Sequence, residues 1–576
     1  MKLVSTLLLA LSLPALADVC STSSAPNCPA SGVKILDDTY PIQSFVISQQ
    51  SFSETNAGRE LPRRAMMELL RAYNFSPENS PNIIYPAGAE DFGKLKTELI
   101  AELVSSGMTE AAATSLVQSR VRHVEALPYT WQQDYFEASF NPATGQPRVN
   151  YSQIYAQRDA QEGAGTRASF NAIAATNLCG LTAGDELLTA VATPQQKFLD
   201  PAALQREAAD TLALGTPPTQ NAEFGGNIEG LPGGLCLVGN NMTERFANQI
   251  CGPSANIVRA EVAWLSVGHV DEVFKVVPDR RQIDGRPREC AFSIFSADTE
   301  LGLSLLKSPG ALNQATLQRK IDPRFTAGFP GMAYDENYQR SVSNPPAMRI
   351  ICPILNEAAT PAVPSAPGGR SAPARVRGAM LELLLIGNAH AQDAAAPVDA
   401  ADANALRCAR NGSEVTNRQF TAAVEALPDL VTYNVRIQEA LVRSRTAMYN
   451  AILGRLPQCR PFFRTMDDMF TKVPNYFSPP SPQEAGSALL NGQLRNPGAF
   501  GNSFFPNPTN SVIANNTLLY PGPVPQAYRE YLDGKTRALG LTPTHLDTWD
   551  YAHTGSGNIH CSSHSIPYCR PAGGTP

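Results

Sequence analysis

The chain contains eleven cysteines, an odd number, spread over its 576 residues. In an oxidising compartment cysteines are expected to pair, so an odd set leaves at least one thiol over. That thiol is either simply buried or available for chemistry, and the count alone leaves both open. The fold must therefore accommodate up to five bridges and one free thiol. The cysteines are Cys20, Cys28, Cys179, Cys236, Cys251, Cys290, Cys352, Cys408, Cys459, Cys561 and Cys569.

The N-terminus indicates export. Residues 1–3 are a short basic start, residues 4–13 are an apolar run, and Ala-Leu-Ala at 15–17 is a small-x-small cleavage site. This is the pattern of a secretory signal peptide. We expect a signal peptide over 1–17, a mature chain from Asp18, and a secreted or periplasmic protein. No run reaches about 18 apolar residues, so we expect no stable membrane insertion.

Charge and proline content limit the class of protein. There are 46 Lys and Arg against 52 Asp and Glu, a net charge of −6, so no global basic field favours nucleic-acid binding. The 47 prolines among 576 residues are more than the average share of about 5%, and they are clustered along the chain. Residues 356–405 are rich in Ala, Pro, Gly and Ser, which indicates a low-complexity insertion. Length alone would suit three or four domains of about 150 residues, although large α/β folds exceed that size.

Hydrophobic spacing predicts the main elements. Leu95, Leu99 and Leu103 recur at i, i+4 and i+8, and Ile437, Leu441, Met448 and Ile452 form a second stripe that Gly454 would end. The predicted helices are 60–73, 91–106 and 434–453. The predicted strands are 39–49, 129–140 and 261–267, the last ending at Gly268, and the glycine-dense stretch 225–234 is predicted to turn.

His269 and Asp271 follow the predicted strand 261–267. In extended backbone two residues apart they would share a face, which places a proton carrier beside an anion that can bind a cation. A His-x-Asp pair is also common as a structural or surface feature.

Within 129–140, alternation would direct Asp134 to one face and Gln133 and Glu137 to the other. One strand could then offer a carboxylate to a pocket and oxygen ligands to a site behind it. A half-exposed strand with solvated charges is the other interpretation.

Cys561 lies beside Gly557 and small polar residues, a setting that permits an exposed nucleophile. The alternative is a disulfide between Cys561 and Cys569.

Together these segments resemble the protein-arginine deiminase family of the guanidine-modifying superfamily. The motifs are Trp-x-Gln-Asp at 131–134, WLSVGHVDE at 264–272 and His-Cys at 560–561, with further likeness in GNIE at 226–229 and FFPNPTNSVI at 504–513. The resemblance implies an α/β fold, the five-bladed α/β propeller (pentein) with pseudo-fivefold ββαβ units. It implies one catalytic domain over 18–355 and 406–576, interrupted by 356–405.

The resemblance also implies roles for residues. Cys561 would attack the guanidinium carbon, His269 would be the general acid and base, and Asp134 and Asp271 would bind the guanidinium nitrogens. Substrate-binding residues would be Trp131 and Val267. The implied product is peptidyl-citrulline with release of ammonia, and the implied partner is an arginine-containing protein or peptide.

Calcium is the cofactor that the resemblance implies, held by Gln133, Glu137 and Glu229 and by the carbonyls of Gly225 and Ile228. Oxygen ligands of this kind suit calcium. A second calcium site is not expected because Tyr135 replaces an acid of the family. The family's Arg before the nucleophile is absent at 555–557, and a second Arg would be Arg148, Arg158 or Arg167.

Two other functions remain open. One is a deiminase of free arginine or agmatine, and the other is a catalytically silent calcium-binding module on the same fold.

Overall fold

The computed structural model describes ten stretches of the chain and residue 552. The predicted signal peptide 1–17 and insertion 356–405 lie outside them, as do four of the cysteines, Cys20, Cys179, Cys352 and Cys408. The described stretches are 26–29, 35–47, 59–125, 131–140, 147–151, 225–265, 267–307, 428–478, 501–548 and 557–570.

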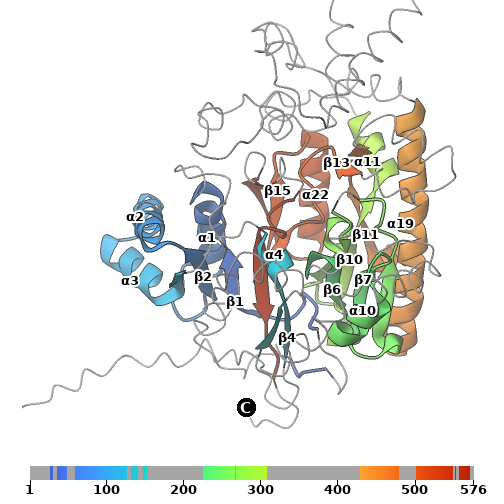
Figure 1. The fold of residues 1–576 in the computed structure, drawn as a ribbon, viewed down its shortest axis with the longest axis horizontal. Helices are drawn as coiled ribbons and strands as arrows, with labels where there is room; N and C mark the ends of the chain where they lie inside the picture. Colours follow the sequence, from blue (N-terminus) through green and yellow to red (C-terminus); the bar gives the residue numbers. More distant parts are fainter. Residues whose placement is uncertain are drawn as a thin grey trace, which may run out of the picture.

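Three sheets share one order: two antiparallel strands, a helical connection, and a third strand parallel to the second (Figure 1). A helical crossover is what parallel neighbours require. The first unit is β6 Ile228–Leu231, β7 Leu235–Gly239, α10 Glu244–Cys251 and β8 Ile257–Ala260; the second is β9 Phe274–Pro278, β10 Phe292–Asp298, α11 Thr299–Leu306 and β11 Phe470–Pro474; the third is β14 Val512–Ala514, β15 Thr517–Gly522, α22 Gln526–Ala538 and β16 Thr542–Asp547.

A fourth unit of this order is assembled from the two ends of the chain. Strand β17 (Ser563–Pro567) pairs antiparallel with β1 (Ile42–Ile47), and β1 pairs parallel with β2 (Asn82–Ala87) across α1 (Glu60–Ala72). The Cys28–Cys569 disulfide joins the same two ends. The sheet continues through α2 Ala89–Ser105, α3 Glu110–Arg120 and β3 Val121–Glu125.

The hairpin of β4 (Phe136–Phe140) and β5 (Pro147–Tyr151) has the first two strands of the same order. The described chain is thus a mixed α/β fold of several small sheets, and a closed ring of five units stays a prediction. The remaining elements are α4 Gln132–Tyr135, α19 Pro428–Arg455, α20 Met466–Met469, β12 Phe477–Ser478, β13 Asn502–Ser503, and the 3₁₀ helices η2 Gly225–Asn227, η3 Ser254–Asn256, η4 Val270–Glu272, η5 Arg288–Cys290 and η7 Pro457–Cys459.

The helices predicted from spacing are confirmed. The leucine stripe of α2 is fully buried, and so is the predicted stripe of α19, which extends one residue past the expected stop at Gly454. Each such side chain stabilises the fold by roughly 1.5–3 kcal/mol on burial. Within the described stretches, no helix has both the length and the apolar character needed to cross a membrane.

The strand predicted over 129–140 is wrong in its first half. Among the described residues of this stretch, Gln132–Tyr135 form the short helix α4 and Phe136–Phe140 are extended. The alternation argument for Asp134 therefore does not hold, because helical backbone does not send neighbours to opposite faces.

The strand predicted over 261–267 is also wrong. Strand β8 ends at Ala260, and the chain then turns, with the Leu265 N–H donating to the Val262 carbonyl. Gly268 has φ 76°, a left-handed conformation that suits glycine, and η4 follows at once.

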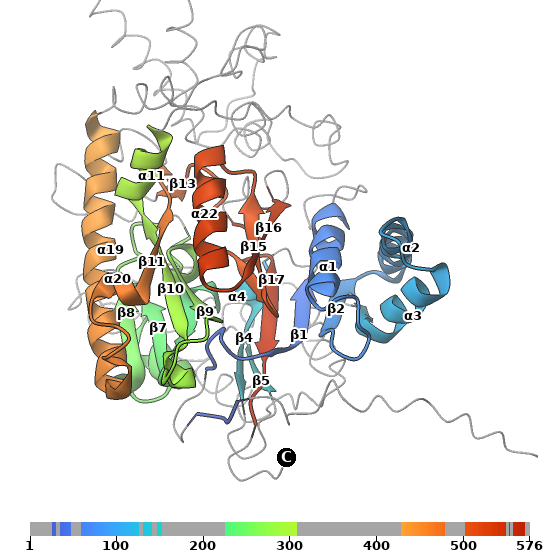
Figure 2. The ribbon, with the colours of Figure 1, turned by 180° about the vertical axis from the view of Figure 1, so that it is seen from behind.

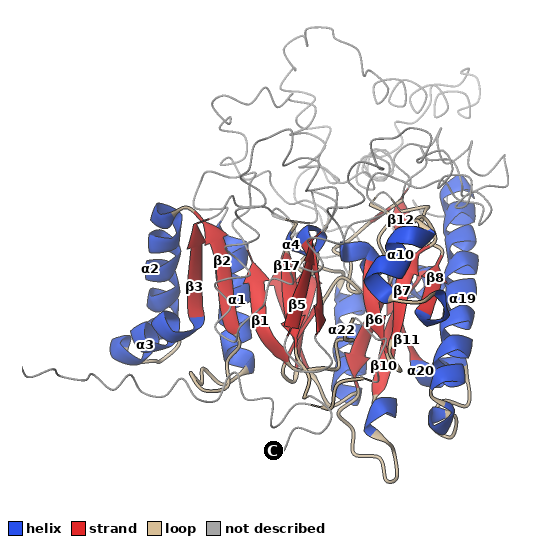
Figure 3. Ribbon diagram, turned by 60° about the horizontal axis from the view of Figure 1, so that its bottom comes forward, coloured by secondary structure: helices blue, strands red, loops and turns tan. Residues whose placement is uncertain are grey.

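The sheets stand side by side, with α2 and α3 at one end of the molecule and α19 at the other (Figure 2). One large apolar core lies between α19 and the sheets of β6–β11, and a second surrounds β1, β2, α1 and α2. The short helix α4 lies in the middle, between these two halves (Figure 3), and contacts β17 and η2. Segments from both halves therefore meet at α4.

A disulfide map tests this fold. The structure pairs Cys28 with Cys569, Cys236 with Cys251 and Cys290 with Cys459, and it leaves Cys561 free. Mass spectrometry after alkylation of the denatured but unreduced chain is expected to find these three bridges and an alkylated Cys561. A Cys561–Cys569 bridge would contradict the arrangement of β17 beside β1.

Candidate active site

Cys561 is a buried free thiol, 5% exposed, in the loop that leads into β17. Its backbone carbonyl accepts from the Gln133 N–H at 3.1 Å, and its N–H donates to Asn510 Oδ1 at 3.2 Å. Asn510 Nδ2 also donates to the Cys561 Sγ at 3.0 Å. The backbone of Cys561 is therefore held by α4 and by Asn510, and Asn510 also contacts the sulfur.

His269 and Asp271 are fully buried at the start of η4. The turn before them is fixed by Asn241, whose Nδ2 donates to the Gly268 carbonyl at 3.1 Å, and Asn227 in turn donates to Asn241 at 3.0 Å. The two residues share one site because the backbone turns sharply at Gly268, not because a strand alternates.

Asp134 approaches from α4. Its Oδ1 lies 3.5 Å from His269 Nδ1. A methyl group at Gly226 would come within 2.5 Å of His269 Nδ1, 3.2 Å of Asp134 Oδ1 and 3.3 Å of Asp271 Oδ2. Because one missing Cβ would meet all three side chains, they converge around the Gly226 backbone.

Asp271 links this group to the thiol. Its Oδ2 lies 3.6 Å from the Cys561 Sγ and accepts from Asn510 Nδ2 at 3.1 Å. It also bonds to His560 Nδ1 at 2.8 Å. The structure thus brings the four predicted catalytic residues, Cys561, His269, Asp134 and Asp271, into one buried cluster.

The cluster carries an unfavourable concentration of negative charge. Burial, and next the Asp271 carboxylate, raise the pKa of Asp134 well above its ordinary value. Burial also raises the pKa of the Cys561 thiol well above its ordinary value, with further contributions from Asp271, Asp134 and Glu272. Without a cation between these groups, the thiol is held in its protonated, less nucleophilic form.

The predicted substrate-binding residues are more exposed than the predicted catalytic residues. Trp131 and Val267 are half-buried, whereas the four predicted catalytic residues are almost fully buried. The Trp131 ring lies against Gly557, where an added Cβ would come within 2.3 Å of it. An indole next to the Cys561 loop offers a flat apolar surface against which an aliphatic chain can pack.

The residues predicted to hold calcium are two buried glutamates and three further buried residues. Glu137 and Glu229 belong to a buried group behind the thiol, and burial raises the pKa of Glu137 well above its ordinary value, with Glu229 adding to the effect. The other three are also buried: Gln133 lies on α4, shortly before Glu137, and Gly225 and Ile228 lie on η2 and β6, shortly before Glu229.

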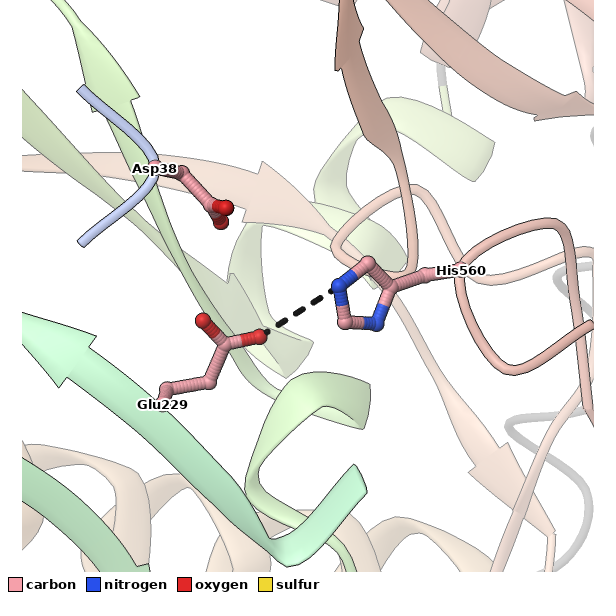
Figure 4. A group of neighbouring side chains, drawn as sticks. All are labelled: Asp38, Glu229 and His560. Atoms are coloured by element: carbon pink, nitrogen blue, oxygen red, sulfur yellow. Dashed lines mark ion pairs between the residues drawn. The ribbon is translucent and has the colours of Figure 1, made fainter. Parts of the chain in front are cut away.

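The same group contains a lysine that the calcium prediction did not include. Figure 4 shows Asp38, Glu229 and His560 directed toward one another, with ligand atoms all within 4.8 Å. The Lys275 ammonium contacts each of the three. Calcium stays a prediction, and these donors fit it only if Lys275 moves away.

Four residues at the site were not predicted: Asn510, His560, Lys275 and Asp38. Asn510 and His560 lie inside the quoted motifs FFPNPTNSVI and His-Cys, so closer attention to the polar members of those motifs could have found them. Lys275 alone interrupts the apolar run of β9, and a charged residue within a buried strand is itself a signal of a partner. Nothing in the sequence near Asp38 indicates its role.

The candidate arginines for gripping a substrate backbone are not placed. Arg158 and Arg167 lie outside the described residues, and Arg148 is in β5 without a described side chain.

Comparison with known proteins gives only distant likenesses. No family model matches the chain, and no curated protein matches it. An agmatine deiminase from C. jejuni aligns over 94% of this chain and 99% of its own, with 10% identity and a TM-score of 0.33. A protein provisionally assigned as a peptidyl-arginine deiminase aligns over 93% and 99%, with 9% identity and a TM-score of 0.33.

The pH dependence of thiol alkylation tests the electrostatics of the cluster. Because the Asp271 carboxylate raises the pKa of the Cys561 thiol, Asp271→Asn should lower it and shift the alkylation profile to lower pH. At pH 7.5 we expect iodoacetamide to react roughly 3–10-fold faster than with wild type, since one pKa unit is tenfold in thiolate. Asp533→Asn, on α22, is the matched control. An unchanged profile, or one shifted to higher pH, would contradict this account.

Proposed function

We propose that the chain hydrolyses a guanidinium group through a covalent intermediate on Cys561. One observation carries the proposal: Asp134 Oδ1 and Asp271 Oδ1 are buried carboxylate oxygens without a hydrogen-bond partner among the described residues, beside a free thiol. Buried anions need a compensating cation. A planar guanidinium, permanently charged and rich in N–H donors, matches two such carboxylates.

The chemistry follows from these groups. The Cys561 sulfur forms a bond to the guanidinium carbon, and the thiol proton passes through His269 to a substrate nitrogen. That nitrogen leaves as ammonia and a thiouronium remains on the sulfur. Water then attacks the same carbon, His269 takes its proton, and the C–S bond breaks to release the urea-type product and the thiol.

The raised pKa of the thiol is consistent with this mechanism. In the empty site the carboxylates oppose thiolate formation. A bound guanidinium supplies positive charge between Asp134 and Asp271, which favours the thiolate when the target carbon is in place. The nucleophile is then generated mainly in the complex, which limits reaction with other electrophiles.

We propose an arginine residue of a protein or peptide as the substrate. Support comes from the exposure pattern, because the reacting groups are buried while Trp131 and Val267, close to Asp134 and His269 along the chain, are half-buried. A long side chain can reach the thiol while its own main chain stays outside. The product would be peptidyl-citrulline. Free arginine and agmatine carry the same guanidinium and remain the alternative substrates.

Three broader proposals accompany this one. The four described ββαβ units and the β4–β5 hairpin support a five-bladed α/β propeller. The sequence pattern over 1–17 supports export, and the three disulfides are consistent with an oxidising compartment. The domain would be a single catalytic body over 18–355 and 406–576.

Citrulline formation tests the function. The mature chain should convert an arginine amide blocked at its amino group, and Cys561→Ala should lose all measurable activity while keeping the Tm of wild type. Parallel assays with free arginine and agmatine rank the substrates by kcat/KM. Full activity in Cys561→Ala would refute the mechanism. Absence of product from every guanidine would favour the catalytically silent module.

Gly226→Ala tests the convergence of the catalytic groups. The added Cβ would press on His269 and fill space between Asp134 and Asp271, so we expect kcat/KM to fall by about 100-fold or more, because misplacement by about 1 Å can cost that much. Gly93→Ala is the matched control, since a Cβ there meets nothing within 4 Å and alanine suits the helix α2. Equal activity in both variants would contradict the geometry.

A further inference from the structure

Lys275 lies in the buried strand β9, and its side chain is 2% exposed. Its Nζ lies 3.3 Å from Glu229 Oε1 and 2.7 Å from His560 Nε2, and it forms an ion pair with Asp38. These partners come from three distant parts of the chain: the segment before β1, strand β6 and the loop of the thiol. The ammonium is the point at which they meet.

The partners are the same three residues whose arrangement would suit a metal ion. Their ligand atoms lie within 4.8 Å of one another (Figure 4), and the lysine nitrogen is in contact with all three. An ammonium has three N–H donors and no acceptor, so three acceptors satisfy it completely. A divalent cation at this point would face the ammonium at close range, where two like charges in a buried site repel strongly.

We propose that Lys275 is a built-in cation that takes the place of calcium, so that the positive charge facing Asp38 and Glu229 is supplied without a metal ion. The Asp38 and Glu229 carboxylates stabilise the ammonium against the cost of its burial. The positive charge is then permanent, and assembly of the site does not depend on the calcium concentration outside the cell.

The charge at Lys275 also reaches the thiol. Because the ammonium can only donate, His560 Nε2 must accept its hydrogen bond, and the proton of the neutral ring is then on Nδ1. That Nδ1–H donates to Asp271 Oδ2 at 2.8 Å, and the same oxygen lies 3.6 Å from the Cys561 sulfur. Lys275 is thus a positioning residue, which fixes the tautomer that orients Asp271.

One feature favours an additional ion. Glu137 Oε2 is buried without a hydrogen-bond partner among the residues that the structure describes. The experiment below would detect a calcium ion bound at Glu137 directly. Such binding would contradict the proposal.

The experiment measures calcium binding and thermal unfolding of the full mature chain, first in EDTA and then in CaCl₂. Wild type is expected to show no saturable calcium binding by calorimetry below about 1 mM, the weak end of extracellular calcium sites, and no change of Tm. Lys275→Met leaves buried carboxylates uncompensated, so its Tm in EDTA should fall by at least about 3 °C. Calcium should restore part of that loss and bind at least about 10-fold more tightly than to wild type.

Lys94→Met is the matched control, because Lys94 is an exposed lysine paired with one carboxylate, and it should behave as wild type. Saturable binding of calcium to wild type below about 1 mM, or a Tm of wild type that rises with calcium, would overturn the proposal even if Lys275→Met fails to fold. A Tm of Lys275→Met equal to that of wild type in EDTA would overturn it too. None of these readouts uses catalysis, so the result is independent of whether the proposed deiminase activity is found.

Discussion

Two carboxylates and a thiol are buried side by side, and the other features of the site depend on this constraint. Burial and mutual repulsion raise the pKa of the Asp134 carboxyl and the pKa of the Cys561 thiol well above their ordinary values. Such a group is costly for the fold unless a cation completes it. The substrate of the proposed reaction is that cation, so binding of the substrate and activation of the nucleophile become one event.

Two cation positions lie on either side of the Asp271–His560 hydrogen bond. At the first position, beside Cys561, the positive charge is transient and would arrive with the substrate. At the second position, between Asp38 and Glu229, the positive charge is the permanent ammonium of Lys275. His560 connects the two because each of its ring nitrogens contacts one side. The fold makes this possible by pairing β17 with β1, which brings the loop of Cys561 and the segment of Asp38 from opposite ends of the chain.

The sequence predicted those parts of the fold that depend on local periodicity. The stripes of α2 and α19 are buried as expected, because a helix presents i and i+4 to the same face whatever surrounds it. The same reasoning failed at 129–140 and 261–267, where the chain forms a short helix over Gln132–Tyr135 and a turn before Gly268. The residues of the motifs nevertheless lie together in the structure. Their identities therefore predicted the site correctly, although the secondary structure predicted for them was wrong. Lys275 and Asp38 were missed because their meaning lies in a contact across about 240 residues of sequence, which no local pattern reports.

The central claim is that Cys561 reacts when a planar cation lies between Asp134 and Asp271. The most direct test compares its alkylation by a chloroacetamidine, which is a planar cation, with alkylation by the neutral chloroacetamide of the same shape. The account predicts that the cationic reagent modifies Cys561 at least about 10-fold faster in wild type, and that Asp134→Asn removes most of this preference. Equal rates for the two reagents in wild type, or modification of Cys561 mainly by the neutral one, would contradict it.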